Sequence, residues 1–472
     1  MEKYSNTNLI LKTDSYKFSH PFQFPQGMDY MHNYLEARGG EYPGTIFFGL
    51  QYILKRHFLK QIAVEDVYEA SAFCKAHGVP FCQDGWMHIA QTLGGRLPVR
   101  IRAVPEGTLV PLQNVLMTIE STDAKTAWLP GHIETLLMQI WYPITVGTRS
   151  YYTRKLIFES LVKTADDPNQ EIDFKHHSFG YRGVSSCESA GIGGCAELLF
   201  SKGTDTIAGI LCAMNYYNSG MCGFSIPAAE HSTITSYGKD GEVEAYRNML
   251  KQFGRPGSIF ACVSDSYDIY NACEHLWGGQ LKDEVIKSGA TVVIRPDSGS
   301  PVDEIVLKCL CILQDKFGFT VNTKGYRVLK NVRVIQGDGI DIGMIEKILS
   351  RINDNGFSTT NIAFGQGGGS LQKLNRDTFQ MAIKCSLVKV NGQYRDVFKD
   401  PITDSGKISK KGRVDLIQTR TFGSDSNVSR YETVTLGTNQ TNHPQSVLRT
   451  IFDDGQLLVD DSFDDIKKRS HL

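Results

Sequence analysis

Three segments in the second half of the chain share one pattern of apolar and polar positions. Each begins as a run of β-branched or apolar residues and ends in Gly, Asp or Arg: VVIRPDSG (Val292 to Gly299), RVIQGDG (Arg333 to Gly339) and NIAFGQGGG (Asn361 to Gly369). Apolar runs of this kind are typical of strands buried in a parallel sheet, and α/β folds bind ligands at the carboxyl ends of such strands. We therefore expect the three loops to form one ligand-binding edge.

Strand signals recur through this half of the chain at a spacing of about thirty residues, which suits strand–helix repeats. They start near Ile259, Val292, Val332, Ile362 and Ile383. Between two of them, the segment from Val302 to Phe317 places its apolar residues on one helical face, and Gly318 follows it. The pattern predicts a barrel-like α/β domain over residues 151–387.

Both ends of the chain lack this regularity. Residues 1–150 mix short strands with helices, and the strands after about residue 388 are joined by Asn391-Gly392 and Asp454-Gly455. Such dipeptides are typical two-residue hairpin turns. At 472 residues the chain is long enough for two cores. We expect residues 1–150 and 388–472 to form a second α/β domain together.

Composition narrows the range of partners. The formal net charge of −1 argues against attraction to nucleic acid or to a membrane surface, so we expect a small anionic ligand. The eleven cysteines are scattered without a CxxC pair, which indicates reduced thiols and no structural zinc. No signal-type segment and no membrane-spanning run is evident, so the prediction is a cytoplasmic protein.

The strand-end loops favour a sugar phosphate with a divalent cation. Their glycines allow backbone N–H groups to approach an anion closely. Arg295 supplies a guanidinium fork, while Asp297 and Asp338 suit ribose hydroxyls or a metal ion.

Three further segments have both a functional and a structural interpretation. Phe179, Tyr181 and Arg182 lie among glycines in HHSFGYRG, which suits an aromatic ring beside a phosphate or, equally, a buried aromatic turn. Asp205 in KGTDT is either a ligand contact or a helix cap. His231 in SIPAAEHSTIT is a base, a phosphoryl acceptor, or a helix-start histidine bonded to backbone groups. The residues alone leave these alternatives open.

A series of motifs runs from near the first residue into the carboxyl-terminal part of the chain. They are TDSYK (Thr13 to Lys17), FGYRGVSS (Phe179 to Ser186), KGTDT (Lys202 to Thr206), PAAEHST (Pro227 to Thr233), SDSYDIYNACE (Ser264 to Glu274), IRPDSG (Ile294 to Gly299), VIQGDG (Val334 to Gly339), GGG (Gly367 to Gly369), LQKLNRD (Leu371 to Asp377) and FKDP (Phe398 to Pro401). In these motifs and their order the chain resembles the nicotinamide phosphoribosyltransferase family of type II phosphoribosyltransferases.

The resemblance implies an irregular (β/α) barrel-like domain and a second α/β domain built from both chain ends. It also implies transfer of phosphoribosyl from phosphoribosyl pyrophosphate to nicotinamide in NAD salvage, with Mg²⁺, in a homodimer with two shared active sites. Phe179 and Tyr16 of the partner subunit would sandwich the pyridine ring, and Asp205 would accept a hydrogen bond from the carboxamide. Arg295 would approach the ring, and ATP would phosphorylate His231 to couple its hydrolysis to product formation.

The other positions of the family site carry over to this sequence as follows. Catalytic roles fall to His231, Asp297, Arg295 and Glu230, with Asp14 of the partner subunit near the ring. The ribose and its 5′-phosphate would contact Gly337, Asp338, Gly367, Gly368 and Arg182 and, across the interface, Arg376 and Lys384. Arg38, Lys399 and Lys407 would face the pyrophosphate or the nucleotide phosphates. No metal ligand is assigned.

The sequence departs from the animal members of the family at four residues. Ser178 stands in place of an aspartate, and Ala261, Gln366 and Ala382 stand in place of serines. The segment from Arg38 to Thr45 is also shorter, which affects the expected contacts near Arg38.

Three other functions compete with this prediction. A nicotinate phosphoribosyltransferase is disfavoured by Asp205, because a carboxylate pairs with an amide NH₂ but repels the carboxylate of nicotinate. A non-catalytic binding or signalling protein of the same fold would be expected to lose His231 or Arg295, which this chain keeps. A phosphohydrolase using His231 would release ADP without nicotinamide.

Overall fold

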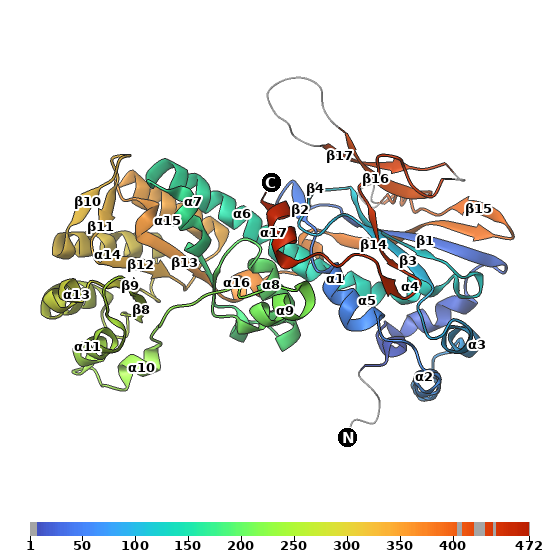
Figure 1. Ribbon diagram of the computed structural model, residues 1–472, viewed down its shortest axis with the longest axis horizontal. Helices are drawn as coiled ribbons and strands as arrows, with labels where there is room; N and C mark the ends of the chain where they lie inside the picture. The colour runs from blue at the N-terminus through green and yellow to red at the C-terminus, as the bar shows by residue number, and fades with distance from the viewer. Residues whose placement is uncertain (1–6, 404–407, 420–429, 438–439, 472) are drawn as a thin grey trace. The chain divides into compact units, whose positions relative to one another are not determined.

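The computed structural model describes residues 7–403, 408–419, 430–437 and 440–471. The chain forms two compact units. The first comprises Met1–Thr148, Asn215–Ser219 and Asn375–Leu472, and the second comprises Arg149–Met214 and Gly220–Leu374. The first unit therefore contains both the blue and the red end of the colour scale in Figure 1.

The second unit is built on parallel strands. Among its described residues, six strands form one sheet, in the order β7 (Gly203–Thr204), β6 (His176–Ser178), β13 (Ile362–Gln366), β12 (Val332–Gln336), β9 (Thr291–Arg295) and β8 (Ile259–Val263). All neighbouring pairs are parallel, so the carboxyl ends of the strands meet at one edge. The prediction that the three loops lie side by side is confirmed, because they follow the adjacent strands β9, β12 and β13.

Helices bury the apolar side chains of this sheet. The predicted helix is confirmed with its expected bounds as α14 (Val302–Phe317), whose residues Val306, Leu310 and Leu313 are fully buried. The other α-helices and strands of this unit are α7 (Pro168–Glu171), α8 (Cys187–Glu197), α10 (His231–Thr235), α11 (Glu242–Phe253), α12 (Ile269–Asn271), α13 (Lys282–Ser288), α15 (Ile342–Asp354), α16 (Gly368–Leu371), β10 (Phe319–Val321) and β11 (Arg327–Leu329). Helix α9 (Ile207–Tyr217) begins in this unit, and its last three residues belong to the first. Helix α6 (Trp141–Thr164) runs from the first unit into the second. Within the described residues, no helix has the length and apolar character needed to span a bilayer.

The described residues of the first unit form a seven-stranded sheet with antiparallel neighbours. Its order is β15 (Gln393–Asp396), β14 (Met381–Val390), β1 (Met28–Ala37), β5 (Val115–Ser121), β3 (Val99–Ala103), β18 (Arg449–Asp453) and β19 (Gln456–Leu457). The smaller elements are β2 (Gly44–Ile46), β4 (Leu109–Pro111), β16 (Val414–Thr419), β17 (Arg430–Thr435), α1 (Leu50–Ile53), α2 (Val64–His77), α3 (Gln83–Met87), α4 (Leu129–His132), α5 (Glu134–Met138) and α17 (Phe463–Ser470). Both predicted hairpin turns are confirmed: Asn391 and Gly392 join β14 to β15, Asp454 and Gly455 join β18 to β19, and all four have positive φ.

One strand prediction needs correction. The strand expected near Ile383 is β14, but it pairs antiparallel with β1 instead of extending the parallel sheet of the second unit. The connection from β13 contains only the short helix α16 and a 3₁₀ turn, η10 (Arg376–Thr378). Without a crossover helix the chain does not return to a parallel position beside β13.

Candidate active site

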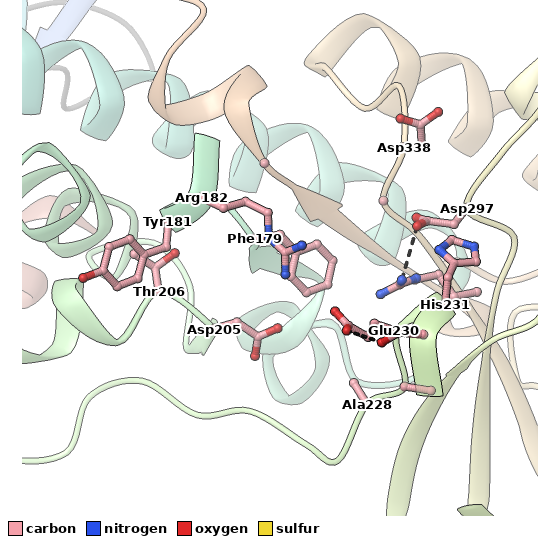
Figure 2. Close-up of a pocket in the computed structure, with 15 residues that line it drawn as sticks. Phe179, Tyr181, Arg182, Asp205, Thr206, Ala228, Glu230, His231, Asp297 and Asp338 are labelled. Carbon is pink, nitrogen blue, oxygen red and sulfur yellow. Dashed lines mark hydrogen bonds and ion pairs between the residues drawn. The ribbon is translucent and has the colours of Figure 1, made fainter. Parts of the chain in front are cut away.

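A cavity of about 980 Å³ lies at the carboxyl edge of the parallel sheet. The strands β6, β7, β9, β12 and β13 each end in a residue or loop that lines it. The sequence-predicted residues that it brings together are Phe179, Arg182, Asp205, Glu230, His231, Arg295, Asp297, Gly337, Asp338 and Gly367. Gly368 follows as the first residue of α16. Figure 2 shows His231 and Asp297 on one side of the cavity and Tyr181 and Thr206 on the other.

The Phe179 ring packs directly against the backbone of Gly365. Phe179 follows β6, and its N–H donates to the Gln366 carbonyl on β13 at 2.8 Å. A Cβ atom at Gly365 would lie 2.0 Å from the Phe179 ring, so only glycine leaves room for the ring in this position. The His177 ring lies 4.9 Å from the Phe179 ring, centroid to centroid. Sequence analysis had assigned no role to Gly365 or His177, because their positions depend on the pairing of β6 with β13.

Asp205 presents an ionised carboxylate to the cavity. Its Oδ1 lies 3.2 Å from Nε2 of His177 and accepts a hydrogen bond from Ser225 Oγ. Burial raises the pKa of Asp205, but the hydrogen bonds from His177 and Ser225 outweigh burial and bring the pKa below its ordinary value. Its side chain is 42% exposed, which leaves it accessible to a ligand.

His231 is oriented by a buried carboxylate. It is the first residue of α10, and its Nε2 lies 2.9 Å from Oδ1 of Asp265, in the loop after β8. An acceptor at Nε2 favours the tautomer with the proton there, which leaves a lone pair on Nδ1. The preceding residue, Glu230, accepts a hydrogen bond from Ser232 Oγ. The sequence alone did not identify Asp265 as a site residue, although it lies in the SDSYDIYNACE motif, two residues after the end of a strand.

Charged residues also lie at the carboxyl ends of β9 and β12. The Arg295 guanidinium lies 3.2 Å from Oδ2 of Asp297. Burial raises the pKa of Asp297, an effect that Arg295 opposes and the Asp265 carboxylate reinforces. After β12, Gln336 Nε2 donates to the Asp338 carbonyl at 3.0 Å and fixes the turn that carries the Asp338 side chain.

Two glycine-containing turns approach each other closely at the cavity wall. A Cβ atom at Gly183 would lie 3.1 Å from Cα of Gly368. This contact holds the Tyr181–Gly183 turn, η7, against the loop that begins at Gly367. Arg182, which is exposed on η7, is thereby kept beside the glycine-rich loop.

The other predicted site residues lie in the first unit. Tyr16 is 58% exposed in the 3₁₀ segment η2 (Ser15–Phe22), and Asp14 accepts a hydrogen bond from Thr135 Oγ1 at 2.8 Å. Burial lowers the pKa of Lys384, Glu134 opposes this, and three cations lower the pKa further. These cations are Arg38, Lys399 and Arg376, so the predicted phosphate contacts of this unit form one basic cluster. Lys407 lies outside the described residues.

Within the described part of the chain, no group of three or more His, Cys, Asp or Glu side chains is arranged to hold a metal ion. Asp297 and Asp338 nevertheless both line the cavity. One or two carboxylates combined with substrate phosphates are the usual donor set for Mg²⁺, so these two residues are compatible with it.

Comparison with known proteins places the site in a family context. The model of the nicotinate phosphoribosyltransferase (NAPRTase) family matches residues 174–456, and that of the nicotinamide phosphoribosyltransferase N-terminal domain matches residues 8–101. A nicotinamide phosphoribosyltransferase of Xanthomonas campestris pv. campestris (strain 8004) is 52% identical over 96% of this chain and 95% of its own length. Another, from Mycoplasma pneumoniae (strain ATCC 29342 / M129 / Subtype 1), is 31% identical over 87% of this chain and 96% of its own.

Two solved structures share the fold at low sequence identity. A nicotinate-nucleotide pyrophosphorylase from Pyrococcus furiosus superposes with a TM-score of 0.61 at 15% identity and covers 100% of both chains. The human nicotinic acid phosphoribosyltransferase superposes with a TM-score of 0.59 at 15% identity, covering 97% of this chain and 93% of its own. The predicted fold class, an α/β fold of the type II phosphoribosyltransferases, is confirmed.

Proposed function

The chain belongs to the nicotinate phosphoribosyltransferase family, and we propose that it transfers phosphoribosyl from phosphoribosyl pyrophosphate to nicotinamide. The products are nicotinamide mononucleotide and pyrophosphate, and the reaction belongs to NAD biosynthesis. The observation that carries the choice of acceptor is the ionised, half-exposed carboxylate of Asp205 at the cavity wall.

Asp205 discriminates between the two pyridine acceptors by charge. An ionised carboxylate accepts a hydrogen bond from the NH₂ of a carboxamide, whereas it repels the carboxylate of nicotinate. The Phe179 ring offers one face for stacking the pyridine, and Arg295 lies on an adjacent part of the same cavity. Tyr16 of the partner subunit would cover the second face of the pyridine in a cytoplasmic homodimer with shared active sites.

The chain supplies the electrostatics that phosphoribosyl transfer needs. Positive charge develops at the anomeric carbon as pyrophosphate leaves, so the reaction depends on a stabilised leaving group and a well-positioned neutral pyridine. Arg182 and the backbone of Gly337 and Gly367 would bind the ribose 5′-phosphate. Asp297 and Asp338 would hold Mg²⁺, which neutralises charge on pyrophosphate when bound.

The basic cluster of the first unit, Arg38, Arg376, Lys384 and Lys399, would contact phosphates across the dimer interface.

ATP hydrolysis would be coupled through His231. In this step Nδ1 attacks the γ-phosphorus of ATP, the bond to the β,γ-bridging oxygen breaks, and ADP leaves. Asp265 keeps the other ring nitrogen protonated, and water later hydrolyses the phosphohistidine to phosphate. Glu230, adjacent in sequence, is the second carboxylate of this part of the cavity.

The test is to incubate the purified protein with phosphoribosyl pyrophosphate and Mg²⁺, with nicotinamide or nicotinate, and with or without ATP. We expect nicotinamide mononucleotide to form preferentially and its yield to rise with ATP. Product from nicotinate instead would assign the chain to nicotinate transfer. Steady ADP release without any mononucleotide would indicate a phosphohydrolase, and neither activity would indicate a binding protein.

A further inference from the structure

A buried carboxyl group without a good hydrogen-bond partner lies behind the glycine-rich loop. Glu197 is the last residue of α8 and is 2% exposed. Within the described residues, neither carboxylate oxygen has a well-formed hydrogen bond. The hydroxyls of Ser178 and Ser370, which are also buried, act on this carboxyl. Such a group is costly to bury and therefore points to a specific role.

The two serines lead from Glu197 to different parts of the cavity wall. Ser178 is the last residue of β6, and its Oγ lies 2.9 Å from Oγ1 of Thr206. Ser370 lies in α16, and its Oγ donates to the Gly367 carbonyl at 3.1 Å. Thr206 and Gly367 both line the cavity, so one buried carboxyl is connected to two of its walls.

A change in the protonation state of Glu197 would change where the Ser370 hydroxyl points. A neutral carboxyl donates its proton to a serine oxygen, which leaves the Ser370 proton free for the Gly367 carbonyl. An ionised carboxylate only accepts, so it draws the Ser370 proton away from Gly367. The Ser178 side would be less sensitive, because Thr206 can donate to Ser178 and so leave the Ser178 proton available to Glu197.

We propose that Glu197 is a positioning residue: its neutral form keeps the Gly367 turn in the shape that binds the phosphoribosyl group, and its ionised form loosens that turn. The phosphoribosyl ligand in this proposal rests on the proposed function. Burial raises the pKa of Glu197 to about 7, opposed by Ser178 and Ser370, so both forms are populated near neutral pH. The affinity of the loop for a phosphoribosyl ligand would therefore fall as pH rises through about 7.

Other titratable groups near Glu197 do not explain this behaviour. On α8 itself they are Cys187, Glu188 and Cys195, and on the surrounding elements they include His176 and His177 (β6), Tyr181 and Arg182 (η7), Asp205 (after β7), Cys212 (α9), Lys373 (after α16), and Arg149 and Arg154 (α6). None of them contributes to the shift in the pKa of Glu197. Arg149 and Arg154 donate to the carbonyls of Lys373 and Phe200.

The experiment measures the Kd of phosphoribosyl pyrophosphate by calorimetry between pH 6 and 8.5, without turnover. In the unsubstituted protein, Kd should rise about fivefold across this range, after any change caused by titration of the ligand itself is subtracted. A fivefold change in Kd corresponds to the loss of one ordinary hydrogen bond. Glu197→Gln, a neutral side chain of nearly the same shape, should keep the low-pH affinity throughout. Ser370→Ala should show the weaker, high-pH affinity throughout, because the Gly367 carbonyl loses the hydroxyl donor at every pH and keeps only the backbone N–H of residue 370.

A matched control is available in the first unit. Glu106 is also buried, and burial raises its pKa to about 7, but its Oε1 accepts from the Gln51 N–H. Glu106→Gln should therefore retain the unsubstituted pH profile. If the Kd of Glu197→Gln depended on pH as it does in the unsubstituted protein, the proposal would be overturned. If Glu197→Gln did not fold, a pH-dependent Kd in Ser370→Ala would overturn it instead. Failure of the proposed function would appear separately, as absence of mononucleotide synthesis.

Discussion

The imidazole of His231 and the carboxylate of Asp265 form a close pair, with Nε2 and Oδ1 2.9 Å apart. The two side chains differ sharply in exposure: that of His231 is 48% exposed and that of Asp265 is 4% exposed. A buried carboxylate that holds an accessible imidazole fixes the orientation of the ring and stabilises positive charge on it. This arrangement suits a histidine that must present one nitrogen to a ligand.

Asp265→Asn should uncouple ATP from synthesis. The amide keeps the shape of the side chain but removes the charge that stabilises a protonated or phosphorylated ring. We expect the ATP-stimulated rate to fall roughly a hundredfold, while synthesis without ATP is largely kept. The measurement is the ratio of ADP to nicotinamide mononucleotide, together with acid-labile phosphate on the protein. Full stimulation by ATP in this variant would show that Asp265 does not support His231.

Asp205→Ser should erode the preference for nicotinamide. Serine has no charge to repel the carboxylate of nicotinate and binds the carboxamide less strongly. We expect the ratio of kcat/KM for nicotinamide to kcat/KM for nicotinate to fall by about tenfold. An unchanged ratio would remove Asp205 from the determinants of acceptor choice. Because the Asp205 side chain is 42% exposed, the substitution should leave the melting temperature nearly unchanged.

Gly365→Ala should displace the Phe179 ring. The new Cβ would lie 2.0 Å from the ring, which must move away from the sheet. We expect the KM for nicotinamide to rise about tenfold with a smaller change in kcat, because overpacking of this kind costs about 1–3 kcal/mol. Gly220→Ala is the matched control, since a Cβ there has no heavy atom within 4 Å. Equal nicotinamide KM values in the two variants would contradict the proposal that the position of the Phe179 ring determines nicotinamide binding.

The sequence predicted those features that depend on local pattern. Helix α14 was found with its bounds because its apolar residues recur at helical spacing and a glycine follows. The two hairpin turns were found because Asn-Gly and Asp-Gly favour positive φ at both positions. The loops after β9, β12 and β13 were expected at one edge because parallel strands share the direction of their ends.

Features that depend on which strands are neighbours were not predicted. His177 reaches Asp205 because β6 pairs with β7, and Gly365 receives the Phe179 ring because β6 pairs with β13. Strand order leaves no local signal in the sequence. The same reason explains β14, because nothing in its own residues reveals that its partner is β1.

The buried carboxyl of Glu197 should also contribute more to stability in mild acid than in mild base. The pKa of Glu197 is about 7 in the folded chain, against an ordinary value of 4.5. Its contribution to stability is therefore fully present below about pH 4.5 and is lost as pH rises through about 7. Each pKa unit corresponds to about 1.36 kcal/mol, so the loss is on the order of 3 kcal/mol.

Glu197→Gln removes this titration, because the amide is neutral at every pH. The variant should gain melting temperature relative to the unsubstituted protein at pH 8.5 and show no such gain at pH 5. Glu106→Gln should behave in the same way, since the pKa of Glu106 is also raised to about 7 by burial. The two carboxyls lie in different units, so their effects on stability should be separable. If a variant differed from the unsubstituted protein by the same melting temperature at pH 5 and at pH 8.5, the carboxyl that it replaces would not titrate between them. That carboxyl would be either ionised or neutral at both pH values. Glu197 has a pH-dependent influence on the glycine-rich loop only if its own carboxyl titrates between these two pH values.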